Sequence, residues 1–125
     1  MRLLLDTHAL LWATVSPEVL TASARAAISD AENDVAFSAG SVWELALKWS
    51  AGRLEMPADF AQSLVDRRYS ELPISVNHAL AAADLPTHHR DPFDRMLIAQ
   101  AQLEGRTIVT RDQAFAAYEV ALLPA

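Results

Sequence analysis

Four acidic residues that lie far apart in the chain each fall where a predicted strand has just ended or a predicted helix is just beginning. They are Asp6, Glu44, Asp94 and Asp112. If the strands run parallel, these positions share one edge of the sheet and the four carboxylates meet in one pocket. Carboxylate oxygens are the ligands that Mg²⁺ and Mn²⁺ prefer in proteins. The pattern predicts a site for one or two divalent ions, with metal-assisted cleavage of phosphodiester bonds as its chemistry.

The elements that must position these acids alternate between strand and helix. Short apolar or β-branched runs predict strands at residues 3–5, 35–37, 72–74, 107–110 and 120–123. Helical patterns fill the intervals between them. This alternation favours a three-layer α/β/α sandwich, in which helices cover both faces of a mostly parallel sheet of four or five strands.

Capping residues mark where the helices near the acids begin. Asp91 and the proline after it predict the start of a helix over residues 92–104, which ends before Gly105. Ser41 is predicted to cap the helix that carries Glu44. Both helices then begin at the edge of the sheet where the strands end, because each connects that edge to the start of another strand.

The composition limits the kind of molecule. With 125 residues, of which 52% are hydrophobic, we expect one compact domain over residues 1–125. The absence of cysteine excludes disulfides, cysteine-bound zinc and thiol nucleophiles. No apolar run approaches membrane-spanning length, and Asp6 interrupts the opening apolar run too early for a signal peptide. We therefore expect a cytoplasmic protein without a membrane partner.

The net charge of −6 weakens the case for a nucleic-acid substrate, because phosphate backbones are normally bound by a basic surface. Part of this charge belongs to the four candidate ligands, and nine of the ten basic residues are arginines, whose forked guanidinium suits phosphate. Trp12, Trp43 and Trp49 are expected mainly in the core, with stacking on a nucleic-acid base as the alternative.

Each of the four acids also has a structural explanation. Asp6 could cap the helix that follows it, and Asp112 could cap a turn. Asp94 lies in the first turn of its helix, where the helix dipole favours a carboxylate. Glu44 fits a Ser-x-x-Glu capping box and could also pair with Lys48. Only the convergence of the four favours metal binding over these separate roles.

Polar neighbours of the acids are candidates for supporting roles. Thr7 could bind substrate, and both Thr7 and Thr110 could orient a carboxylate through their hydroxyl groups. Arg95 could pair with a carboxylate or bind a substrate phosphate. His88 and His89 are adjacent, which excludes the spacing of a zinc protease. We expect them in a loop at the mouth of the site.

Four short segments carry a shared pattern: Leu5–His8, Ser41–Glu44 with Lys48, Arg90–Arg95 with Ala99–Ala101, and Thr110–Asp112. Together they resemble a PIN-domain protein, and within that family the VapC toxins of bacterial type II toxin–antitoxin pairs. The resemblance covers essentially the whole chain, and the Asp-Pro-Phe-Asp-Arg block is its most specific part.

The resemblance implies an Mg²⁺- or Mn²⁺-dependent endoribonuclease with a cognate antitoxin and a homodimeric assembly. It implies that Asp6, Glu44, Asp94 and Asp112 form the acidic quartet of the family, whose fourth member varies. Hydrolysis by an activated water would leave a 5′-phosphate and a 3′-hydroxyl, with no side-chain nucleophile.

Three other classes of protein are alternatives. A PIN-like scaffold could bind a partner without cutting RNA, and metal binding without RNA turnover would identify it. A phosphate-accepting receiver domain needs a lysine near the end of its last strand, whereas Lys48 is the only lysine here. A phosphatase of the haloacid dehalogenase type needs Asp-x-Asp after the first strand, where this chain has His8 at the second acidic position.

Overall fold

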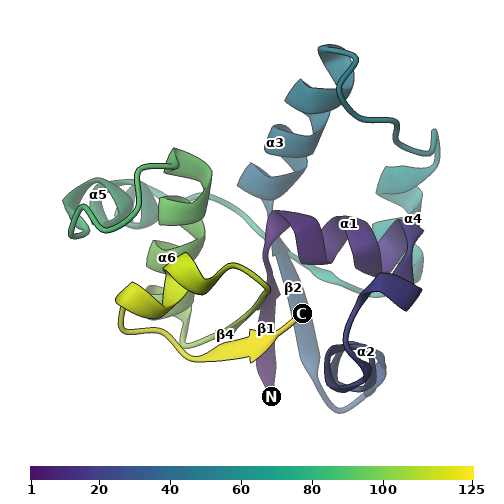
Figure 1. The fold of residues 1–125 in the computed structure, drawn as a ribbon, viewed down its shortest axis with the longest axis horizontal. Coiled ribbons are helices and arrows are strands. Elements are labelled where there is room, and N and C mark those ends of the chain that lie inside the picture. Colours follow the sequence, from purple (N-terminus) through teal and green to yellow (C-terminus); the bar gives the residue numbers. More distant parts are fainter.

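The sheet has five strands, and all of its neighbouring strands run parallel. The computed structural model describes residues 1–125 and places the strands in the order β3-β2-β1-β4-β5. Their bounds are β1 Arg2–Leu5, β2 Asp34–Ser38, β3 Ser70–Leu72, β4 Thr107–Thr110 and β5 Leu122–Pro124. The predicted parallel α/β fold is confirmed (Figure 1).

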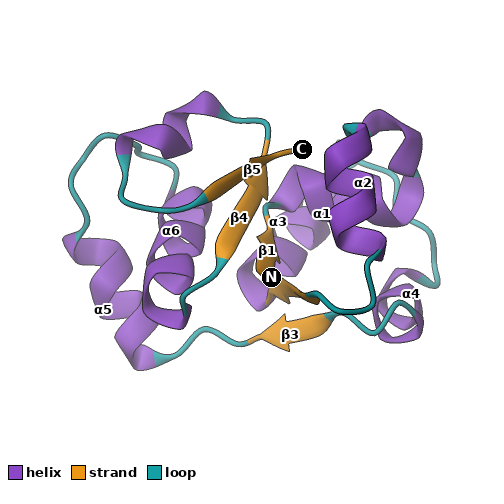
Figure 2. Cartoon of the chain, turned by 90° about the horizontal axis from the view of Figure 1, so that it is seen from below, coloured by secondary structure: helices purple, strands orange, loops and turns teal.

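Helices cover both faces of this sheet. They are α1 Thr7–Val15, α2 Ala22–Ser29, α3 Ala39–Ser50, α4 Phe60–Asp66, α5 Val76–Asp84 and α6 Pro92–Glu104, with short 3₁₀ helices η1 Pro17–Val19 and η2 Gln113–Ala117. Figure 2 shows α5 and α6 on one side of the strands and α1, α2 and α4 on the other. No helix combines the length and the apolar character needed to cross a membrane.

The central strand β1 shows how the two faces are filled. Leu3 and Leu5 pack into the apolar cluster under α1, α2 and α4, whereas Leu4 packs into the cluster under α6. All three side chains are completely buried. A strand that is covered on both faces can be apolar at every position, and each such leucine contributes about 1.5–3 kcal/mol through burial.

The register of the strands brings two of the candidate acids together. Leu5 at the end of β1 pairs with Val109 in β4, and the backbone N–H of Asp6 donates to the Val109 carbonyl at 3.1 Å. The end of β4 at Thr110 therefore lies beside Asp6. Since β2 ends at the same edge, α3 starts there as well (Figure 1).

The start of α3 differs from the prediction. Its N-cap is Ser38, whose hydroxyl accepts a hydrogen bond from the Gly40 N–H at 3.0 Å, and Ser41 lies inside the first turn. The predicted capping box between Ser41 and Glu44 is therefore wrong, and Glu44 lies in the second turn. The chain enters the helix as soon as β2 ends, because Ser38 is both the last residue of the strand and the cap.

Two tryptophans of α3 are not in the core. Trp43 is 60% exposed and Trp49 is 51% exposed, so the prediction that they are mainly buried is wrong. Leu45 carries the buried face of α3. Trp43 instead packs edge-on against Phe93 of α6, with ring centroids 5.3 Å apart. Trp12 is partly buried, as expected for a helix packed on the sheet.

Candidate active site

A cavity of about 130 Å³ lies at the edge of the sheet where the parallel strands end. The residues that line it are Asp6, Thr7, His8, Glu44, Lys48, Asp91, Asp94, Asp112 and Phe115. All four acids of the predicted site are among them. Their carboxylates come from the end of β1, the middle of α3, the first turn of α6 and the turn after β4.

Asp6 is held from two sides at the bottom of this cavity. One carboxylate oxygen accepts from the Ala9 N–H at 2.7 Å and so caps α1, and the other accepts from the Thr110 hydroxyl at 2.5 Å. The side chain is buried, and burial raises the pKa of the Asp6 carboxyl above its ordinary value, while the two hydrogen bonds oppose the rise. Thr110 thus orients Asp6 from the neighbouring strand.

Glu44 is held by Thr7 and Lys48. The Thr7 hydroxyl donates to Glu44 Oε1 at 2.8 Å, and Lys48 Nζ lies 3.3 Å from Oε2. Thr7 is only 4% exposed and its hydroxyl proton is shared between Glu44 and Ser41, which lies 3.1 Å away. The hydroxyl thus orients Glu44, which is one of the two roles predicted for Thr7, and a direct substrate contact stays a prediction.

Asp94 has the most perturbed carboxyl group in the chain. Burial, together with the negative charge of Asp91, raises its pKa to about 7, and Glu44 and Asp6 add to the rise while His89 opposes it. Burial is the larger cause of this rise, and the neighbouring carboxylates add to it, so a cation bound among them would favour the ionised form of Asp94.

Asp112 combines a capping contact with a position at the cavity. Its Oδ1 accepts from the Ala114 N–H at 2.9 Å, so it caps η2, and its own N–H donates to the Thr110 hydroxyl at 3.0 Å. Its side chain is 47% exposed, which makes it the most open of the four acids. Thr110 therefore contacts both Asp6 and Asp112.

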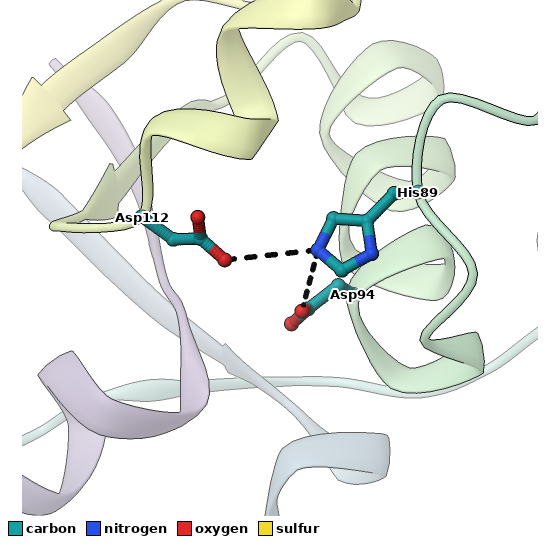
Figure 3. Close-up of side chains that lie close together, drawn as sticks. All are labelled: His89, Asp94 and Asp112. Carbon is teal, nitrogen blue, oxygen red and sulfur yellow. Dashed lines mark ion pairs between the residues drawn. The ribbon is translucent and has the colours of Figure 1, made fainter.

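His89 lies at the site, as expected for the loop that carries it, but the sequence did not predict its contacts with Asp94 and Asp112. Its Nε2 lies 3.0 Å from Asp94 Oδ2 and 3.6 Å from Asp112 Oδ2 (Figure 3). One ligand atom from each of these three residues lies within 4.8 Å of the others. These contacts could have been inferred from the position of His89, two residues before the N-cap Asp91. A side chain at that position can lie beside the first turn of α6.

Arg95 does not line the cavity and forms no ion pair, so the predicted pairing with a carboxylate is wrong, while contact with a substrate phosphate stays a prediction. Its guanidinium donates to carbonyl oxygens at the end of α5 and in the loop before α6. These belong to Ala82 (2.8 Å), Ala83 (3.4 Å), Leu85 (2.9 Å), Pro86 (2.9 Å) and His89 (3.2 Å). The arginine holds the loop that carries His89 against α6, so its donors are already used within the protein.

The lining of the cavity fits a divalent metal ion. Five carboxylates line it, and Lys48 is the one lysine or arginine among the lining residues. Lys48 already pairs with Glu44, and the carboxylates of Asp91, Glu44 and Asp6 add to the rise that burial causes in the pKa of Asp94. The donors are mainly carboxylate oxygens, which suit Mg²⁺ or Mn²⁺ better than softer metals.

The fold and the site together define an α/β protein with an acidic cavity at the carboxyl edge of a parallel sheet. A model of the PIN domain family matches residues 3–121. The chain therefore belongs to the PIN domain family.

One known ribonuclease is similar in sequence to part of this chain. The chain is 38% identical over 60 residues to ribonuclease VapC16 of Mycobacterium tuberculosis, a match that covers 46% of this chain and 43% of that protein. The chain thus matches less than half the length of this curated relative.

Solved structures share the fold over almost the whole chain. VapBC2 from Rickettsia felis, bound to a fragment of its promoter DNA, has a TM-score of 0.71 at 17% identity and covers 98% of both chains. FitAB bound to the IR36 DNA fragment has a TM-score of 0.70 at 22% identity, covering 97% of this chain and 93% of the other. The toxin–antitoxin complex VapBC-5 from Mycobacterium tuberculosis has a TM-score of 0.61 at 19% identity, covering 99% and 98%.

Proposed function

We propose that this chain is a metal-dependent endoribonuclease and the toxin of a type II toxin–antitoxin pair. The observation that carries the proposal is the convergence of Asp6, Glu44, Asp94 and Asp112 on one cavity in a PIN-domain chain. The similarity to a ribonuclease supports the activity. Residues 1–125 then act as a single nuclease domain, and the cytoplasm is where such a domain meets RNA.

The four acids are the proposed ligands for one or two Mg²⁺ or Mn²⁺ ions. When bound, the ion lowers the pKa of water and withdraws charge from the scissile phosphate. The protein's own contribution is to hold the ligands: Thr110 fixes Asp6, and Thr7 fixes Glu44. We expect products with 5′-phosphate and 3′-hydroxyl ends.

The activity is tested by cleavage of RNA with purified protein and variants of single acids. Asp6→Asn and Asp94→Asn each remove one charge with little change in shape, and we expect both to abolish cleavage while far-UV circular dichroism stays unchanged. Asp84→Asn is the matched control, because Asp84 is exposed at the end of α5 and does not line the cavity. Full cleavage by either site variant, or in excess chelator, would refute the proposal.

An apolar groove offers a surface for the proposed antitoxin. It has a volume of about 370 Å³ and lies between α3 and α4, lined by Phe37, Ala39, Val42, Ala61, Leu64, Val65, Tyr69 and Glu71. The solved VapBC and FitAB structures, which are complexes by name, support a protein partner. Such a groove suits the apolar face of an amphipathic segment.

Exposed apolar pairs on α5 and on α3, outside the groove, support the proposed homodimer. Val76 and Leu80, one turn apart on α5, are 75% and 66% exposed, and Trp43 and Leu47 on α3 are 60% and 46% exposed. Pairs spaced four residues apart share a helix face. Exposed apolar side chains gathered in this way indicate a contact with another molecule.

The two surfaces can be separated by one substitution in each. Val76→Glu should convert the dimer to a monomer in light scattering after gel filtration. Val65→Glu, at a position that is 66% exposed in the groove beside α4, should leave the dimer intact but weaken binding of the proposed antitoxin. The same effect of both substitutions on both measurements would contradict the assignment.

A further inference from the structure

His89 has a ring nitrogen that is buried beside the acidic cavity without a hydrogen-bond partner. Its Nε2 is screened from solvent, and although Asp94 Oδ2 is 3.0 Å away and Asp112 Oδ2 is 3.6 Å away, neither contact has hydrogen-bond geometry. Buried polar atoms are nearly always paired, so this one requires an explanation.

The other ring nitrogen determines which atom carries the proton. The backbone N–H of Asp91 donates to His89 Nδ1 at 3.3 Å. A nitrogen that accepts a hydrogen bond has no proton of its own, so the neutral ring carries its proton on Nε2. Nε2 therefore offers an N–H group to the two carboxylates, and its lone pair is not available to a metal ion.

The position of this ring is fixed by contacts on all sides. The His89 backbone N–H donates to the Tyr118 hydroxyl at 2.8 Å, and its carbonyl accepts from Arg95 at 3.2 Å. The ring packs edge-on against Phe115, with centroids 6.0 Å apart. The direction of the Nε2–H group is thus set by the fold before any ligand binds.

We propose that His89 is a positioning residue that donates its Nε2–H to the carboxylates of Asp94 and Asp112 and does not itself bind the metal ion. The donor lies between the two acids, 3.0 Å from Asp94 Oδ2 and 3.6 Å from Asp112 Oδ2 (Figure 3). Donors behind ligating carboxylates fix their orientation and support metal affinity. This inference rests on the proposed function, because it takes Asp94 and Asp112 as the ligands.

The competing assignment makes His89 a fifth ligand, since its Nε2 lies within 4.8 Å of the carboxylate oxygens of Asp94 and Asp112. Metal binding through Nε2 would require the proton to move to Nδ1, which would end the hydrogen bond from Asp91. An imidazole ligand would also shift the preference of the site towards transition metals. The two assignments predict different spectra and different effects of substitution.

Pulsed electron paramagnetic resonance on the Mn²⁺-loaded wild type and on His89→Leu distinguishes them; both samples are needed because His8 also lines the cavity. A donor role predicts that the wild type has no ¹⁴N coupling of the size produced by a directly bound imidazole that His89→Leu lacks. A directly coordinated nitrogen that disappears in His89→Leu would overturn the proposal.

Substitutions test whether the donor matters. His89→Leu removes the donor, whereas His89→Gln places an amide N–H₂ close to the position of Nε2. We expect His89→Leu to weaken Mn²⁺ binding by about 10- to 100-fold in isothermal titration calorimetry, and His89→Gln to recover most of that loss. His88→Leu is the control, because His88 is adjacent but exposed. Equal loss in both His89 variants, or loss in neither, would overturn the proposal.

Cleavage of RNA by the same samples separates this inference from the proposed function. A wild type that binds Mn²⁺ in a His89-dependent manner but leaves RNA intact supports the role of His89 and refutes the nuclease. A wild type that cleaves RNA while His89→Leu binds Mn²⁺ normally refutes the role of His89 alone. A wild type that binds no Mn²⁺ refutes both.

Discussion

Replacing Asp94 with asparagine should make the metal-free protein more stable. The Asp94 side chain is 20% exposed, and its pKa is raised from 3.8 to about 7. Each pKa unit corresponds to roughly 1.4 kcal/mol, so ionising this carboxyl at pH 8 costs the folded state at most about 4 kcal/mol. Partial exposure and relaxation of the site lower this limit, and we expect Asp94→Asn to stabilise the protein by about 1–3 kcal/mol.

The pH dependence of this effect has a definite sign. Because the pKa is higher in the folded state than in the unfolded state, the folded state binds more protons between the two values. Stability therefore falls as the pH rises from about 4 to about 7 and remains reduced at higher pH. Asp94→Asn should remove this part of the dependence, with the largest gain at pH 8 and little gain at pH 4.

Thermal unfolding in the presence of a chelator measures the effect. For a chain of this length a gain of 1 kcal/mol corresponds to roughly 3–5 °C in the melting temperature. Mg²⁺ should raise the melting temperature of the wild type but not that of the variant, because a ligand stabilises only the state that binds it. Asp84→Asn is the control. A variant that is less stable than the wild type at pH 8 without metal would refute the argument from crowded charge.

Substitutions at three further positions test how the site and a neighbouring helix are held. Thr110→Val removes the donor to Asp6 and should weaken Mg²⁺ binding by about 10- to 100-fold in calorimetry, whereas Thr110→Ser should not. Arg95→Ala leaves several carbonyls without their donor and should cost about 2–4 kcal/mol in chemical unfolding, with faster proteolysis of the loop before α6. His78→Ala removes the capping contact with the Ser75 N–H and should cost about 1–2 kcal/mol in the same unfolding experiment.

The parts of the fold that sequence reasoning predicted are those governed by local pattern and by topology. The apolar run at Leu3 to Leu5 indicates a strand buried on both faces, and this is what the structure contains. The convergence of the four acids follows from parallel strands whose ends share an edge. The cap at Asp91 and the left-handed C-cap at Gly105 also follow from local chemistry, and the helix between them was predicted correctly.

The parts that were missed depend on geometry that forms only in the folded chain. Ser38 and Ser41 are equally good caps by type, and the end of β2 decides between them. The donors of Arg95 could have reached either the acids or the loop, and the path of the loop decides that they bind its carbonyls. The orientation of the His89 ring depends on the Asp91 N–H and on packing against Phe115, which meet the ring only in the folded chain.

Capping and participation in the site are not alternatives in this fold. Asp6 and Asp112 each cap a helix with one carboxylate oxygen, which leaves the second oxygen directed to Thr110 in Asp6 and towards His89 in Asp112. A carboxylate has two oxygens, so a backbone N–H can fix one while the other remains free to interact elsewhere.

The acids that do not cap a helix are held in a different way, and this has a measurable consequence. Glu44 depends on Thr7 and Lys48, and Asp94 has His89 as its nearest partner. Replacing Asp6 by alanine should therefore cost stability through the lost cap as well as metal affinity, because α1 loses the acceptor for its Ala9 N–H. Replacing Asp94 should cost metal affinity without losing a helix cap, and the metal-free protein should gain stability. The backbone N–H groups at two helix starts thus hold Asp6 and Asp112 in place among like charges.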